Sequence, residues 1–222
     1  MRFVMQSAAM ESNWAAEHLQ VIRILMERSA LYRRSLAPIM IFNGVLGVAA
    51  AALGRALGVG SLTAFILFWA GVAMVGLTGS LLLVRRQALK EAQPFWSPPT
   101  RRVTQALLPP LAAGLMIASV VLGRAVSAQD PQVGLAGLLW LPVLWVVLYG
   151  CAFHAAGFFM PRGMRLFGWG FILGGCGLFV ADIPAGVRPA DYAHAVMAFF
   201  FGGLHLAYGI YLYFTEPRRN ET

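Results

Sequence analysis

Two histidines and two cysteines lie deep in apolar sequence, where polar side chains are costly and are therefore candidates for function. They are Cys151, His154, Cys176 and His205. Imidazole and thiolate groups bind metals, and two histidines alone can hold a haem iron from both sides. The alternative is a structural role, with hydrogen-bonded histidines and cysteines that pack as small apolar residues. Because the spacing of the four residues is not diagnostic, we predict no cofactor and keep haem b at His154 and His205 as an alternative.

A second polar cluster lies around the start of the last apolar segment. It consists of Asp182, Arg188, Asp191 and His194. These side chains are close enough to the ends of apolar segments to bind a cation, a proton or a polar solute. The alternative is an ordinary charged loop in which Asp191 caps the following helix.

Motifs of the common membrane and soluble enzymes are missing from the sequence. There is no His-Glu-x-x-His zinc motif, no P-loop and no pair of carboxylates within an apolar segment. We therefore expect no enzymatic activity and assign no catalytic residue.

The elements that must position these side chains follow from the composition. Of the 222 residues, 59% are hydrophobic and 12% are charged, whereas an ordinary soluble domain has roughly 45–50% and about 25%. Crossing the hydrocarbon takes about 20 apolar residues in a helix, and six such runs occur, at 37–56, 62–84, 104–123, 137–160, 166–183 and 192–214. The sequence thus predicts an all-α membrane protein, with a six-helix transmembrane bundle over 36–216 and a cytoplasmic tail at 217–222.

The basic residues indicate how this bundle is oriented. All seventeen lysines and arginines except Arg55, Arg124 and Arg188 fall on one side of the predicted membrane. The positive-inside rule places that side, with both termini, in the cytoplasm. The net charge of +8 is then a property of the cytoplasmic face and gives no reason to expect a nucleic-acid partner.

Basic residues beside the bilayer attract anionic lipids. The longest inner loop and its flanks carry a group of them, for which we predict contact with lipid headgroups: Arg85, Arg86, Lys90, Arg101 and Arg102. The expected partners are the lipid bilayer and its anionic lipids at this face.

The N-terminal region, 1–35, alternates apolar and basic residues with helical spacing. It predicts an amphipathic helix that lies on the inner leaflet, packs on the cytoplasmic ends of the bundle or binds a partner. Within the bundle, Gly54-Arg55 and Gly123-Arg124 close two spans in the same manner. This similarity is consistent with three parallel helical hairpins, although unrelated hairpins share such boundaries.

Glycines are dense in the last two predicted spans. Gly170 and Gly174 form a small-xxx-small pair, which allows close helix packing either inside the bundle or between protomers. A homo-oligomer or a larger membrane complex is therefore one expectation for this chain.

Residues 22–34 and 36–40 resemble the opening of small uncharacterised bacterial six-span inner-membrane proteins. The resemblance implies a bacterial inner membrane and carries no activity. We therefore expect a non-enzymatic inner-membrane protein that binds or passes a small solute or lipid, or serves as a membrane-embedded accessory subunit. The alternatives are a haem- or metal-binding redox protein that uses His154 and His205, and a structural assembly component.

Overall fold

The computed structural model describes residues 36–90, 92, 94–128, 131–183 and 185–215. The expected N-terminal helix over 1–35 and the tail over 217–222 lie outside these residues. Within them, every regular element is a helix, and six helical segments are long and apolar enough to cross a membrane. This confirms the predicted all-α architecture with six spans. The chain is a multi-pass membrane protein.

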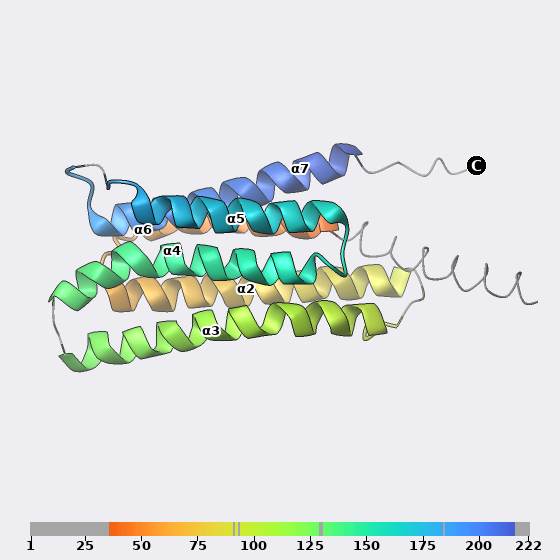
Figure 1. The fold of residues 1–222 in the computed structure, drawn as a ribbon, viewed down its shortest axis with the longest axis horizontal. Coiled ribbons are helices and arrows are strands. Elements are labelled where there is room, and N and C mark those ends of the chain that lie inside the picture. The colour runs from red at the N-terminus through yellow and green to blue at the C-terminus, as the bar shows by residue number, and fades with distance from the viewer. Residues whose placement is uncertain (1–35, 91, 93, 129–130, 184, 216–222) are drawn as a thin grey trace, which may run out of the picture.

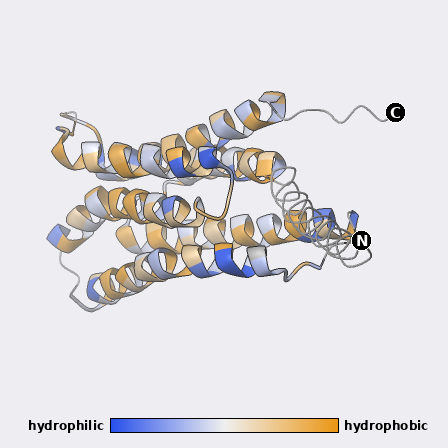
Figure 2. Ribbon diagram, turned by 45° about the vertical axis from the view of Figure 1, so that its right-hand side comes forward, coloured by the Kyte–Doolittle hydropathy of each residue, from blue (hydrophilic) through white to orange (hydrophobic). Residues whose placement is uncertain are grey.

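The helices are arranged as an antiparallel bundle (Figure 1). The first span is Leu36–Ala56. It is followed by α2 (Leu62–Lys90), α3 (Pro98–Ala128), α4 (Pro131–Ala156) and α5 (Arg162–Val180). The sixth span consists of α6 (Pro189–Met197), the π-helix η1 (Ala198–Leu204) and α7 (His205–Thr215). Hydrophobic residues dominate the ribbon of this bundle (Figure 2).

Proline sets several helix boundaries that differ from the expected ranges. The helices α3, α4 and α6 each begin with proline, which suits the first helical turn because its missing N–H has no intrahelical partner there. As a result α3 and α4 each begin six residues before the expected starts at 104 and 137. At its other end α4 stops at Ala156 rather than 160, and α5 begins directly after Pro161.

The helix α4 is central, because it contacts α2, α3, α5 and α6, and its most extensive contact is with α5. Adjacent helices are therefore not grouped into three separate pairs, and the parallel-hairpin repeat stays a prediction. Two buried clusters fill the interior. One surrounds Phe65 and Trp69, and the other surrounds Phe167 and Phe171.

Glycines allow close backbone contact between the first and sixth spans. A Cβ atom at Gly47 would lie 2.5 Å from the carbonyl oxygen of Phe201, and one at Gly209 would lie 2.8 Å from the backbone nitrogen of Ile41. The same holds for α4 and α5, where a Cβ atom at Gly168 would lie 2.5 Å from the backbone nitrogen of His154. Small residues at such crossings let helices pack through their backbones in the membrane.

The predicted pair Gly170 and Gly174 is divided between two environments. A Cβ atom at Gly174 would meet the ring of Phe200 at 2.7 Å, so this glycine packs inside the bundle. A Cβ atom at Gly170 would have no atom of a neighbouring helix within 4 Å, so this glycine faces open space.

Gly168, which packs against α4, and Gly170, which faces open space, give a matched pair of substitutions. Gly168→Ala is expected to lower the unfolding temperature in detergent, because its Cβ meets backbone atoms that cannot move aside. Gly170→Ala is expected to leave that temperature unchanged or raise it, since alanine favours a helix by up to about 1 kcal/mol over glycine. Equal behaviour of the two variants in a thermal unfolding assay would contradict the close α4–α5 contact.

Candidate functional site

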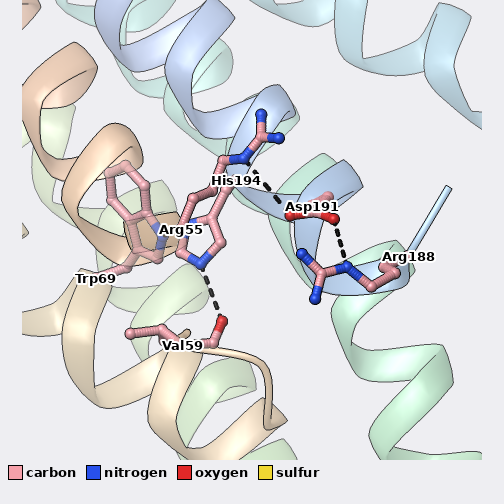
Figure 3. Close-up of polar contacts among 6 residues, drawn as sticks. All are labelled: Arg55, Val59, Trp69, Arg188, Asp191 and His194. Atoms are coloured by element: carbon pink, nitrogen blue, oxygen red, sulfur yellow. Dashed lines mark hydrogen bonds and ion pairs between the residues drawn. The ribbon is translucent and has the colours of Figure 1, made fainter. Parts of the chain in front are cut away.

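One end of the bundle carries an ion-pair cluster that we call the arginine-pair site: Arg55, Arg188 and Asp191 (Figure 3). Asp191 lies in the first turn of α6, and Arg188 immediately precedes this helix. The Arg188 Nε–H donates a hydrogen bond of 2.7 Å to Asp191 Oδ2, and Arg55 Nε lies 3.5 Å from Asp191 Oδ1. The two arginine side chains are 81% and 57% exposed, against 21% for the aspartate. One sheltered carboxylate is thus shared by two accessible guanidinium groups.

His194 follows Asp191 by about one helical turn in α6 and is buried, with 1% of its surface exposed. Its Nε2 lies 3.1 Å from the carbonyl oxygen of Val59, and its Nδ1 lies 3.3 Å from the indole Nε1 of Trp69 (Figure 3). A carbonyl only accepts and an indole only donates, so the ring is the neutral tautomer protonated at Nε2. Both nitrogens are satisfied, and the ring ties α6 to α2 and to the loop before α2.

The space for this ring depends on Gly54 in the first span. A Cβ atom there would lie 2.5 Å from His194 Cε1. The rings of Phe65 and Phe68 complete the surroundings, with centroids 5.2 and 6.1 Å from that of His194. Arg55 follows Gly54 directly, so the packing of His194 also positions Arg55 beside Asp191.

Of the predicted outer cluster, the structure brings Arg188, Asp191 and His194 together on or beside α6. Asp182 is exposed in the loop that follows α5 and takes no part in the arginine-pair site. Sequence reasoning missed Arg55 and Trp69 as partners. Arg55 has a recognisable signal, because it is one of only three basic residues on the sparsely charged side, whereas nothing in the sequence distinguishes Trp69 from other buried aromatic residues.

The second buried histidine, His205, lies in an aromatic enclosure between α4, α5 and α7. Its Nδ1 is 3.1 Å from the carbonyl oxygen of Phe200, and its Nε2 is 2.7 Å from the Tyr149 hydroxyl. By the same reasoning Nδ1 carries the proton and the tyrosine hydroxyl donates to Nε2. The rings of Phe167 and Phe171 lie edge-on, with centroids 5.0 and 5.5 Å away.

The π-helix η1 brings His194 and Gly202 to the same face of the sixth span. In a regular α-helix the eight residues from His194 to Gly202 would leave these two positions about 80° apart around the axis. A π turn takes five residues where an α turn takes four, which removes about 100° of rotation. His194 and Gly202 then both face the first span, where they contact Gly54 and Gly47.

The predicted metal or haem residues are divided among separate environments. His154 contacts the rings of Phe158 and Trp169, whereas His205 lies against Tyr149. Cys151 is half-buried, Cys176 is exposed, and both are free thiols. Within the described ranges, no three histidine, cysteine or acidic side chains gather closely enough to hold a metal ion.

The haem alternative stays a prediction. A haem iron bound to His205 would replace the Tyr149 hydroxyl at Nε2 or the Phe200 carbonyl at Nδ1.

The five basic residues expected to contact lipid headgroups are all exposed. They belong to the last turns of α2 and the first turns of α3, which lie at one end of the bundle (Figure 1).

Comparisons with protein-family models, with curated proteins and with solved structures find no match to this chain. The argument for a function therefore depends on the residues and their contacts.

The two histidines are expected to be opposite tautomers. In ¹⁵N spectra of histidine-labelled protein, His194 should be protonated at Nε2 and His205 at Nδ1, because each of those nitrogens faces a carbonyl. Tyr149→Phe should leave His205 Nε2 without a donor and lower the stability by about 1–3 kcal/mol. The control is Tyr211→Phe, since Tyr211 is 59% exposed. An unchanged His205 Nε2 signal in Tyr149→Phe would contradict the hydrogen bond.

Proposed function

We propose that this protein is a non-enzymatic inner-membrane protein of bacteria that binds the anionic group of a small solute or lipid at the arginine-pair site. The observation that supports the proposal is the sharing of Asp191 by Arg55 and Arg188. Two positive charges and one negative charge leave a net charge of +1 around a partly buried carboxylate at the end of the bundle.

The geometry of the two arginines leaves hydrogen-bond donors for a ligand. Each guanidinium approaches Asp191 through its Nε atom, so the terminal Nη groups remain available for an acceptor. Guanidinium groups match carboxylate and phosphate oxygens in a bidentate manner. Both side chains are largely exposed and can turn toward an arriving anion.

The same arrangement disfavours a cation, which was one expectation for the outer cluster. A cation approaching Asp191 would meet two guanidinium groups already paired with that carboxylate. His194 offers no free lone pair either, because Nδ1 accepts from Trp69 and Nε2 donates to Val59. A carboxylate or phosphate is therefore the better chemical match.

Binding is favoured over passage through the bundle. The first and sixth spans approach through backbone contacts at Gly47 and Gly202, and the polar side chains of His194 and His205 are used in internal hydrogen bonds. The arginine-pair site lies at the end opposite α2's basic last turn (Figure 1). By the positive-inside rule, this end faces outward and both termini are cytoplasmic.

The test is anion binding to purified protein in a neutral detergent, with inorganic phosphate, acetate and a short-chain phosphatidate as probes. At least one of them is expected to bind by calorimetry and to raise the unfolding temperature. Arg55→Gln and Arg188→Gln should each weaken binding about tenfold or more, because a charge-assisted hydrogen bond contributes about 1.5–3 kcal/mol. Phosphatidate binding without phosphate binding would identify a lipid, and the reverse would identify a soluble anion.

Two further variants complete the design. Arg124→Gln is the control, since Arg124 is exposed near the end of α3 and has no contact with Asp191. Asp191→Asn should strengthen anion binding, because it raises the local charge. Loss of binding in Asp191→Asn, or equal losses in Arg124→Gln and Arg55→Gln, would contradict an anion site at these residues.

A further inference from the structure

The junction of α4 and α5, at the end opposite the arginine-pair site, carries a second group of polar side chains. His154 is in the last turn of α4 and Arg165 is in the first turn of α5. The turn between the helices exposes Phe158, and α5 exposes Trp169. We call these four residues the α4–α5 junction cluster.

Ring contacts join the cluster into one surface. The centroid of His154 lies 5.5 Å from that of Phe158 and 5.3 Å from that of Trp169, both edge-on. The Arg165 Cζ atom lies 5.3 Å from the centroid of Phe158. A guanidinium and an imidazole thus contact one exposed phenyl ring, and the indole of Trp169 lies against the imidazole.

His154 is half-buried, and its hydrogen bonding differs from that of the two buried histidines. Its Nδ1 is buried and has no hydrogen-bond partner among the residues that the structure describes, whereas His194 and His205 each use both ring nitrogens. A buried polar atom without a partner is costly and calls for an explanation. Placing the ring proton on Nε2 avoids an unpaired N–H at the buried nitrogen, and this Nε2–H can donate to a group supplied from outside the chain.

Arg165 and Trp169 also lack acceptors within the part of the chain that the structure describes. No carboxylate there forms an ion pair with Arg165, and no acceptor there bonds the indole Nε1 of Trp169. The cluster therefore presents hydrogen-bond donors without their acceptors. Donors of this kind match an anionic oxygen group.

Glycines fix these side chains next to one another. A Cβ atom at Gly168 would lie 2.5 Å from the backbone nitrogen of His154, and one at Gly157 would lie 2.5 Å from Cγ of Arg165. The donors are therefore held by the α4–α5 contact, not by a loose surface loop.

The surroundings point to a lipid as the source of the acceptor. Phe158 is 64% exposed and Leu166 is 72% exposed, so apolar surface borders the donors. The cluster lies at the end of the apolar helices, where tryptophan and arginine commonly meet lipid headgroups. We propose that the α4–α5 junction cluster binds the phosphate of an anionic phospholipid, with Arg165, His154 and Trp169 as donors and Phe158 beside the acyl chains.

The test uses native mass spectrometry of the full chain, released from nanodiscs of phosphatidylcholine with phosphatidylglycerol. Wild-type protein is expected to retain phosphatidylglycerol in preference to phosphatidylcholine. Arg165→Gln should reduce this retention about tenfold, which corresponds to about 1.4 kcal/mol. His154→Phe and Trp169→Phe should each reduce it several-fold, because they keep the ring but remove the donor.

Arg162→Gln is the matched control, since Arg162 is exposed on the same turn of α5 but makes no contact with the phenyl ring of Phe158. It should retain phosphatidylglycerol like the wild type. An equal loss in Arg162→Gln and Arg165→Gln would overturn the proposal in favour of a diffuse basic surface. Displacement of the lipid by inorganic phosphate would also overturn it, because the ligand would then be a soluble anion.

A second measurement separates ligand binding from folding. In detergent without lipid, His154→Phe should unfold at a higher temperature than the wild type, since it removes the unpaired nitrogen. Adding phosphatidylglycerol should raise the unfolding temperature of the wild type and change that of His154→Phe much less. The same increase in both proteins would overturn the role of His154. None of these outcomes depends on the arginine-pair site at the opposite end.

Discussion

The close contact between the first and sixth spans is the interaction on which the rest of the structure depends. It joins segments far apart in the sequence, and it requires glycine at positions such as Gly47 and Gly202, where a side chain would meet backbone atoms. In a bilayer the lipid tails solvate apolar side chains as well as the protein does, so close packing must supply the association. The π-helix is the local adjustment that keeps His194 and Gly202 on the same contact face.

That adjustment links the hydrogen bonds of the two histidines to helix geometry. The imidazole of His205 donates to the carbonyl of Phe200, a residue within the π-helix. At the other side of the turn, His194 bonds to Trp69 and Val59. Rotating either half of the sixth span by one residue would break one of these sets of hydrogen bonds, so the two sets specify a single register.

The sequence was sufficient for the number and type of spans, because six long apolar runs have no other stable arrangement in a membrane. It also placed Arg188, Asp191 and His194 in one cluster, since they lie within seven residues. Arg55 and Trp69 were missed as partners because their contacts with α6 depend on tertiary packing. His154 and His205 were grouped by type and depth, but the phase of α4 and of the sixth span turns them toward different aromatic neighbours.

Histidine therefore has three different environments in one small bundle. His194 and His205 serve as hydrogen-bonded connections whose partners are all within the chain, and their neutral rings fit an apolar interior. His154 has the same chemistry, but its buried Nδ1 has no partner within the described part of the chain. The contrast matters because the cost of an unpaired polar atom is highest where water is excluded. The fold pairs both nitrogens of its two buried histidines, whereas the half-buried His154 beside Arg165 keeps its accessible Nε2 for a hydrogen-bond acceptor from the membrane.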